Sequence, residues 1–411
     1  KIKERPIDSE IGLFLASLES SAFSGMRPKE HLQSYSYQRL YLDLIKKLSY
    51  RCTTDTINKF LHRGDNETLK STTLENRVES FGDALSSAYE SENERVLESH
   101  HVDVASGIVD EKSAISPAAI TPDLPAVLDE GHIRSFMADY NRGRDSLTKL
   151  KFSKQTKNVE ASPERCCYIT VDDVGVKFQK SQRKGNSGRS KKYVENTVIH
   201  VQADNGQYTI TAIGMDQAFR RLIAFLLETG LMEDRRLIFL TDGAVNIRDR
   251  IERFFAFREH TIILDWLHLD KKCYEYMSMA VKGTKAEKDG MKRTLSSILW
   301  TGRADKAIKF LNGIKKKSIK NDRKLNELKD YILRKSPVLT CYALRHELGL
   351  KISSNRVEKE NDLVVASRQK HNGMSWSDKG SGALAIIAAA SRNNELDSFL
   401  VNKQIDRDRK S

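Results

Sequence analysis

The strongest constraint on the fold is a run of three β-rich segments in the middle of the chain. Residues 166–178 read CCYITVDDVGVKF, residues 193–202 read YVENTVIHVQ and residues 207–215 read QYTITAIGM. β-branched and aromatic residues at this density are typical of strands. An Asp-Asn-Gly triplet at 204–206 separates the last two segments and favours a tight hairpin turn. We therefore predict three consecutive antiparallel strands.

Helical and apolar segments then alternate. DQAFRRLIAFLLETG predicts an amphipathic helix, RLIFLTD a short buried strand, AVNIRDRIERFFAF a second helix and TIILDWLHL a further strand. The resulting order, β-β-β-α-β-α-β, predicts an α/β domain in which the first and fourth strands lie side by side. From Lys271 to about Arg345 the chain reads as helical and basic, and GALAIIAAASRNNELDSFL predicts an apolar helix near the end.

The first hundred residues predict an all-α region. Helical periodicity runs from about Glu10 to Leu48. TTDTINKFLHR and STTLENRVESFGDAL predict two short helices around a turn, with Ser71 as the cap of the second. This is the pattern of a helix-turn-helix, although helical hairpins also occur in all-α domains that do not bind DNA.

In the helix-turn-helix interpretation, polar residues of the second helix face a DNA groove, and basic residues around it contact phosphates. Glu75 and Glu79 on the same helix are unfavourable neighbours for phosphate. The residues expected to face the groove are Thr72, Thr73, Asn76 and Arg77, and those expected to contact phosphates are Lys59, Arg63 and Lys70.

Composition divides the chain further and suggests its partner. The 411 residues exceed what one hydrophobic core usually serves. Three prolines in ISPAAITPDLPAVLD disfavour helix and indicate a linker. The expected parts are a helical region at 1–100, a linker at 101–161, the first part of the α/β core at 162–270, a helical insertion at 271–345 and the completion of the core at 346–411.

A formal net charge of +13 favours nucleic acid as the partner, although ribosome-associated, membrane-surface and heparin-binding proteins share such a charge. Five cysteines without metal-finger spacing indicate free thiols in a reducing compartment. No apolar run approaches the length of a membrane span, so we expect a soluble intracellular protein that does not bind membranes.

Two aspartates stand at positions where the expected topology can bring their carboxylates close together. Asp172 lies midway along the first strand, and Asp242 ends the fourth, 70 residues later. Hard divalent cations prefer oxygen ligands, and a pair of them needs carboxylates from several segments. Taken alone, an aspartate at a strand end is more often a helix cap or a turn residue. Their joint placement predicts a metal site.

Four blocks of sequence carry a resemblance to a known family. They are ITVDDVGVKF at 169–178, LTDGAVNIRDRI at 240–251, LDWLHLDKK at 264–272, and SSNRVEKENDLVVASRQKHNGMSWSDKGSGALAII at 353–387. In this order they resemble the DDE transposases of bacterial insertion sequences, in the broad group related to Mutator-like elements. The resemblance covers roughly residues 162–391 and implies a ribonuclease H-like catalytic domain with a helical insertion after the second aspartate.

The resemblance implies a catalytic triad of Asp172, Asp242 and Glu358 that holds two Mg²⁺ or Mn²⁺ ions. Asp173 stands where many family members have glycine, so it remains the alternative first ligand, although neighbouring strand residues point to opposite faces. Glu360 lies two residues from Glu358 on an expected helix and therefore points away from it.

Residues beside the triad have supporting roles in the resemblance. Asp265 and His268 match the Asp/Cys-x-x-His signature of these transposases, and we expect both, with Asp173, to support the metal ligands. Arg368, Lys370 and Trp376 match the conserved tail of the fourth block. We expect these last three to contact DNA, with Trp376 stacking on a splayed base, although an aromatic residue in a helical segment is more often part of a core.

The connection between the first two strands is strongly basic. The stretch KFQKSQRKGNSGRSKKY has seven Lys or Arg residues and no acid. It is either a solvated hairpin loop or a clamp on the DNA backbone, where basic side chains release counterions. The residues expected to contact DNA here are Lys180, Arg183, Lys184, Arg189, Lys191 and Lys192.

The resemblance implies an enzyme that binds the terminal inverted repeats of its element, nicks DNA with metal-activated water and joins the exposed 3′-hydroxyl to target DNA. Bringing two ends together implies a homodimer or a larger assembly, in a bacterial cytoplasm at the nucleoid. Two alternatives remain: a ribonuclease H-like structure-specific nuclease that cuts without joining, and a domesticated protein that binds DNA without cutting it.

Overall fold

The chain divides into two compact units, residues 1–41 and 42–411. Helix α2 (Tyr35–Ile45) spans the division, and all later elements belong to the second unit. The computed structural model describes residues 35–62, 68–103, 108–109, 128–153, 156, 159–160, 163–179, 192–203, 206–354, 359–370, 374–405 and 407. The linker prolines, the turns at 64–66 and 204–205 and most of the basic connection therefore lie outside the described residues.

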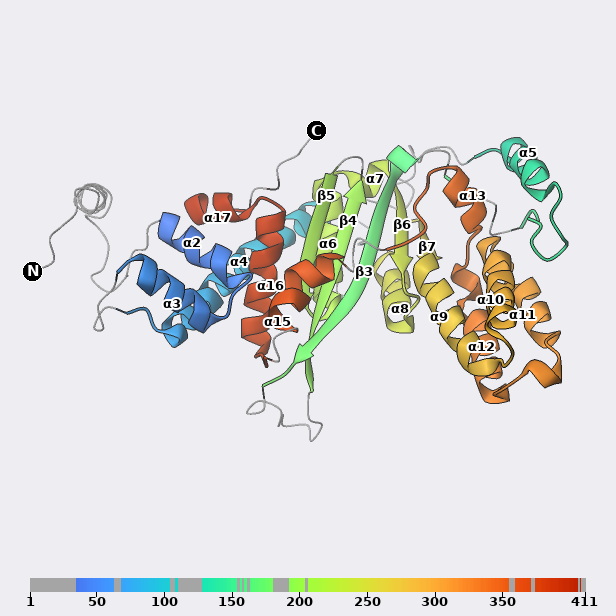
Figure 1. The fold of residues 1–411 in the computed structure, drawn as a ribbon. Helices are drawn as coiled ribbons and strands as arrows, with labels where there is room; N and C mark the ends of the chain where they lie inside the picture. The colour runs from blue at the N-terminus through green and yellow to red at the C-terminus, as the bar shows by residue number, and fades with distance from the viewer. Residues whose placement is uncertain are drawn as a thin grey trace, which may run out of the picture. The chain divides into compact units, whose positions relative to one another are not determined.

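A five-stranded mixed sheet forms the centre of the second unit, in the order β5-β4-β3-β6-β7 (Figure 1). Strands β3 (Cys166–Lys177), β4 (Tyr193–Ala203) and β5 (Gly206–Ile213) are antiparallel neighbours. Strands β6 (Arg236–Thr241) and β7 (His260–Leu264) extend the sheet on the other side of β3, parallel to it. The β-rich segments of the sequence thus form strands of a single sheet.

Side chains of β3 alternate between two hydrophobic cores, because successive residues of a strand point to opposite faces. Cys167, Ile169 and Val171 share one core with helices α6 (Met215–Glu228) and α8 (Val245–Phe254). Cys166 and Tyr168 lie in the other core, with the helices that follow β7. A short helix, α7 (Leu231–Asp234), connects α6 to β6.

A group of helices follows β7, and it covers the part of the chain expected to be helical and basic. These helices pack together with the end of the sheet in one core. A complete capping box at Thr284 and Glu287 starts the second of them, since each side chain accepts from the other's backbone N–H. The helices are α9 (Trp266–Ala280), α10 (Lys285–Trp300), α11 (Ala304–Asn312), α12 (Asp322–Lys335) and α13 (Tyr342–Glu347), with 3₁₀ turns at Lys316–Ser318 and Ser336–Val338.

The two helices expected as a short helix-turn-helix differ from that prediction. Helix α3 (Tyr50–Phe60) is short, but α4 (Ser71–Ser99) is 29 residues long. Its N-cap is Lys70, without a side-chain hydrogen bond, so Ser71 is not the cap. The expected helix extends because Tyr89, Val96 and Leu97 continue its buried face.

Helix α4 packs against α6 and α16 (Asp378–Arg392). At Gly82 of α4, an added Cβ would lie 2.4 Å from the Cβ of Ala383 in α16. No side chain fits between the helices at this point, so glycine permits their close approach. Helix α4 is therefore a structural part of the unit that contains the sheet.

The remaining elements complete the unit. Helix α5 (Glu130–Asn141) has Asp129 as its N-cap, and the Asp129 side chain accepts from the backbone N–H of His132. Near the end of the chain lie a π-helical turn at Asp362–Ala366, α15 (Ser367–Gln369) and α17 (Leu396–Asn402). Two short strands upstream of α5, β1 (Val102–Asp103) and β2 (Ile108–Val109), pair with each other. Among the described helices, none has the length and apolar character needed to cross a membrane.

Candidate functional site

Asp172 and Asp242 both follow the paired residues of the neighbouring parallel strands β3 and β6. Cys166 pairs with Arg236 and Thr170 with Leu240, a constant offset of 70 positions. The two aspartates have the same offset, and each comes two residues after the last of these pairs. Asp172 continues along β3, whereas β6 ends at Thr241, so Asp242 is the first residue of the following turn.

The Asp172 carboxylate accepts hydrogen bonds from Asp173 and from Asn361. Its Oδ1 accepts from the backbone N–H of Asp173 at 2.8 Å. Its Oδ2 accepts from Nδ2 of Asn361 at 2.6 Å, although 189 positions separate the two residues in the sequence. Asn361 lies directly before the π-helical turn, so the end of the chain contributes to this site. Sequence reasoning missed Asn361, and its position three residues after Glu358 was the available signal.

A tight turn fixes Asp242. Its Oδ1 accepts from the backbone N–H of Ala244 at 2.7 Å, and the Thr241 hydroxyl accepts from the N–H of Gly243 at 3.1 Å. Gly243 has a φ of +77°, and Lys335 of α12 donates to its carbonyl oxygen. Desolvation lowers the pKa of Lys335, and the charge of Asp242 opposes this effect. A cation thus lies close to the second aspartate.

Asp173 has different surroundings from Asp172. Its Oδ1 accepts from the Thr197 hydroxyl of β4 at 2.6 Å. Burial raises the pKa of the Asp173 carboxyl, and the hydrogen bond from Thr197 opposes that shift. Because Asp173 contacts the neighbouring strand and Asp172 contacts Asn361, the two acids are held by separate partners.

Asp265 is buried and connects three parts of the site. As the N-cap of α9, it accepts from the backbone N–H of His268 at 2.7 Å through Oδ1. Its Oδ2 accepts from both the backbone N–H and the hydroxyl of Ser354, the latter at 2.6 Å. Its own N–H donates to the carbonyl of Thr241 at 2.8 Å. His268 takes part in this arrangement through its backbone.

Glu358 lies outside the described residues, which end at Ser354 and resume at 359. Within the described part of the chain, no group of three or more His, Cys, Asp or Glu residues could hold a metal ion. Glu360 is 5% exposed, and its carboxylate pairs with Arg392 and accepts from the Thr209 hydroxyl at 3.3 Å. Glu360 is therefore occupied by a structural ion pair.

The oxygen atoms of Asp172, Asp242 and Asn361 are of the kind that a hard divalent cation prefers. Both aspartates have carboxylate oxygens, and the buried amide oxygen of Asn361 makes no hydrogen bond within the described part of the chain. Such cations prefer carboxylate and amide oxygens. These residue types are thus compatible with Mg²⁺ or Mn²⁺ as a ligand.

A cavity of about 310 Å³ adjoins the site. It is lined on the sheet by Tyr168, Thr170 and Gln202, and on its other side by residues 350–354. Thr170 is two residues from Asp172 and shares its face of β3. The Lys351 ammonium lies 4.9 Å from the ring centroid of Tyr168 and donates to Gln202, so a positive charge lies at this cavity.

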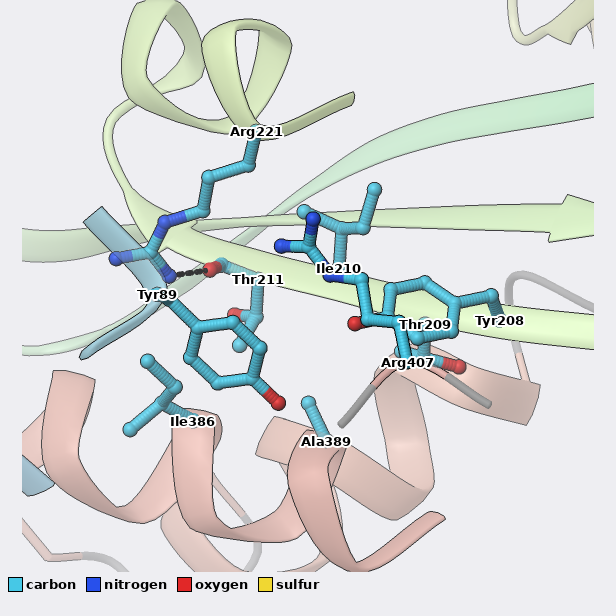
Figure 2. A pocket seen from close by; sticks show the side chains of 9 residues that line it. All are labelled: Tyr89, Tyr208, Thr209, Ile210, Thr211, Arg221, Ile386, Ala389 and Arg407. Carbon is cyan, nitrogen blue, oxygen red and sulfur yellow. Dashed lines mark hydrogen bonds between the residues drawn. The ribbon is translucent and has the colours of Figure 1, made fainter. Parts of the chain in front are cut away.

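A second cavity is too small for a substrate. Figure 2 shows Tyr89, Tyr208 and Arg221 around a space of about 20 Å³, room for roughly one water molecule. Arg221 donates to the carbonyl of Thr211 at 2.6 Å. The hydroxyls of Tyr89 and Tyr208 both donate to the buried carboxyl of Glu395. These contacts hold α4, β5 and the end of the chain together.

The residues expected to contact DNA differ in their exposure to solvent, and several lie outside the described residues. Lys192 and Lys370 are exposed, as are Lys59, Lys70 and the three polar residues that begin α4, whereas Arg77 is half-buried. The exposed polar residues of α4 are Thr72, Thr73 and Asn76. Those outside the described residues are Arg63, Lys180, Arg183, Lys184, Arg189 and Lys191.

Arg368 and Trp376 require a correction, because both are buried. Arg368 is 3% exposed, and its Nε donates to the carbonyl of Ile45 at 2.9 Å. Its guanidinium carbon lies 4.9 Å from the ring centroid of Trp376. Trp376 is 4% exposed and donates from Nε1 to the carbonyl of Gln369 at 3.0 Å. Both side chains pack inside the protein in this structure, whereas a DNA contact requires an exposed side chain.

No protein-family model matches this chain, and a comparison with curated proteins gives no match. Among solved structures, the chain is similar to the Drosophila P element transposase strand transfer complex, with 10% sequence identity and a TM-score of 0.21. The similarity covers 68% of this chain and 75% of that chain.

Proposed function

We propose that this protein is a DDE transposase with a ribonuclease H-like catalytic domain, in which Asp172, Asp242 and Glu358 hold two Mg²⁺ or Mn²⁺ ions. The observation that carries the proposal is that Asp172 and Asp242 each follow, by two residues, the last paired position of the neighbouring parallel strands β3 and β6. The strand order β5-β4-β3-β6-β7, with three antiparallel strands followed by two parallel ones, supports the ribonuclease H-like assignment. The four sequence blocks point to the same family.

Side chains and turns of the protein hold the proposed metal ligands in position. When bound, a pair of divalent ions lowers the pKa of an attacking water or hydroxyl and stabilises the leaving oxygen of a phosphodiester. The turn at Gly243 fixes Asp242, and Asn361 orients Asp172. Asp265 holds Ser354, four residues before Glu358, beside the end of β6. Asp173, Asp265 and His268 support the ligands without holding the ions themselves.

The DNA is held by the basic surface. The net charge of +13, the basic connection between β3 and β4 and the exposed Lys192 and Lys370 support phosphate contacts. The proposed substrates are the terminal inverted repeats of a bacterial insertion sequence and its target DNA. Synapsis of two ends makes a homodimer or a larger assembly the active form, at the nucleoid of the cytoplasm.

The test is cleavage of supercoiled plasmid and candidate element-end DNA in Mg²⁺ or Mn²⁺. Asp172→Ala, Asp242→Ala and Glu358→Ala should each abolish nicking while leaving the protein folded. Asp249→Ala is the matched control, because it removes an exposed acid close to Asp242 in sequence and should leave nicking unchanged. Joining of cut ends to a target plasmid distinguishes a transposase from a nuclease that only cuts. Nicking by the triad variants at the wild-type rate would refute the catalytic proposal.

A further inference from the structure

Asn361, which lies near the end of the chain, contacts Asp172 of β3 directly. It is 6% exposed, and its Nδ2 donates to Oδ2 of Asp172 at 2.6 Å. The π-helical turn Asp362–Ala366 begins at the next residue. Such turns are rare in proteins, and those that occur are often located at functional sites. The position of Asn361 therefore combines burial, a direct contact with Asp172 and an irregular helix.

The other half of the amide is in a different situation. Oδ1 of Asn361 is buried and makes no hydrogen bond to any residue that the structure describes, whereas Nδ2 donates to Asp172. The orientation of the amide follows from chemistry, because a carboxylate oxygen accepts hydrogen bonds and would repel an amide oxygen. A buried carbonyl oxygen without a partner is uncommon and indicates a missing ion or water, or a catalytic role.

The available chemistry favours a cation. An amide oxygen beside a carboxylate is a typical oxygen pair for a hard divalent ion. Glu358 precedes Asn361 by three positions in the sequence. Glu360, the intervening acid, is occupied by Arg392. Asn361 is therefore the residue best placed to add an oxygen donor to the carboxylates of the site.

We propose that Asn361 has two roles in the metal site: its Nδ2 orients Asp172, and its Oδ1 is a ligand of the divalent ion that Asp172 holds. This inference rests on the proposed function, because it assumes a metal at Asp172. In this proposal, the amide of Asn361 both holds the Asp172 carboxylate in position and supplies one of the oxygen atoms that coordinate the ion. The two roles respond differently to substitution, so they can be separated.

The test is direct binding of Mn²⁺ to the full chain without DNA, measured by electron paramagnetic resonance titration of free Mn²⁺. Asn361→Ala removes both the donor and the oxygen, and we expect the affinity to fall by about tenfold or more, as is typical for residues supporting a metal site. Asn361→Asp removes the donor but keeps an oxygen ligand, so it should bind Mn²⁺ at least as tightly as the alanine variant and close to wild type. Asn246→Ala, an exposed asparagine near Asp242, is the matched control and should bind like wild type.

Thermal unfolding in EDTA and in Mn²⁺ gives the second measurement. Asn361→Asp places a second negative charge beside Asp172, so it should unfold earlier in EDTA and gain more stability from Mn²⁺ than wild type does. A purely structural asparagine would give equal losses of affinity in the alanine and aspartate variants, which would overturn the ligand role.

The outcomes also separate this inference from the proposed function. Mn²⁺ binding that depends on Asp172 but is unchanged in Asn361→Ala would overturn the role of Asn361 and leave the metal site intact. Mn²⁺ binding that is the same in wild type and Asp172→Ala would overturn both. Binding that depends on Asp172, weakens in Asn361→Ala and recovers in Asn361→Asp supports the inference, whether or not the protein joins DNA ends.

Discussion

Ser354 donates two hydrogen bonds to one oxygen of Asp265, from its backbone N–H and from its hydroxyl. The other carboxylate oxygen of Asp265 caps α9 through the N–H of His268. One buried carboxylate thus joins the start of a helix to the segment that leads toward Glu358. The signature pair Asp265 and His268 can therefore affect the site without touching a metal.

We predict that Asp265→Asn weakens this connection while keeping the cap. The asparagine retains one oxygen for His268, but its amide nitrogen cannot accept from Ser354. The free energy of unfolding should fall by about 1–3 kcal/mol, the cost of leaving a buried donor unpaired. Urea denaturation measures this change. Ser354→Ala removes only the hydroxyl and should cost about 1 kcal/mol, and equal stability of Asp265→Asn and wild type would contradict the prediction.

Gly243→Ala should destabilise the turn that holds Asp242. Gly243 has a φ of +77°, and a Cβ there would lie 2.7 Å from Cδ1 of Leu264 and 2.9 Å from Nζ of Lys335. Left-handed backbone strain and crowding together should cost roughly 2–5 kcal/mol. Gly143→Ala is the control, because Gly143 has a similar φ of +71° with nothing within 4 Å of the added Cβ. It should show the strain alone, about 1–2 kcal/mol, and equal losses in the two variants would show that crowding at Gly243 is unimportant.

The buried ion pair between Arg345 and Glu160 should be essential for stability. The two side chains are 2% and 1% exposed, with an N···O distance of 2.9 Å. Glu160→Gln leaves the arginine charge buried and uncompensated, which should cost roughly 3–5 kcal/mol in chemical denaturation. Glu327→Gln breaks the more exposed pair with Arg323 and should cost at most about 0.5 kcal/mol. A small effect at Glu160 would show that water reaches Arg345.

Glu395 should make stability depend on pH. Burial raises the pKa of its carboxyl above the ordinary value of 4.5, and hydrogen bonds from Tyr89 and Tyr208 oppose the shift. The folded state therefore keeps this proton to a higher pH than the unfolded state. Its contribution to stability is present below pH 4.5 and is lost as the pH rises through the raised pKa. Glu395→Gln should remove this loss, so the variant should gain stability relative to wild type with rising pH in denaturation series, and a constant difference would contradict the assignment.

Lys192 and Arg368 should differ in their effect on DNA affinity. Lys192 is exposed, so Lys192→Ala should reduce the slope of log affinity against log salt by about 1 if it contacts a phosphate. Arg368→Lys should leave that slope unchanged, because Arg368 is buried against Trp376. It should instead lower the free energy of unfolding by about 1–3 kcal/mol. A change in the slope of log affinity against log salt in Arg368→Lys would indicate that Arg368 contacts DNA.

The sequence by itself determined the local elements of the sheet and the spacing of the two aspartates. Strands β3, β4 and β5 carry dense β-branched and aromatic residues, so their backbone preference is visible without a partner. The spacing of 70 between Asp172 and Asp242 equals the register offset of β3 and β6. Periodicity also indicated α6 and α8, because an amphipathic face repeats within each helix.

Only the tertiary structure decided the length of α4, the burial of Arg368 and Trp376, and the contact of Asn361 with Asp172. Helix α4 extends to Ser99 because α6 and α16 cover its apolar face. Arg368 is satisfied by the distant carbonyl of Ile45, and Asn361 reaches a strand 189 positions away. Each of these features depends on a partner far along the chain, and the free energy of burying a polar side chain is set by that partner rather than by its sequence neighbours.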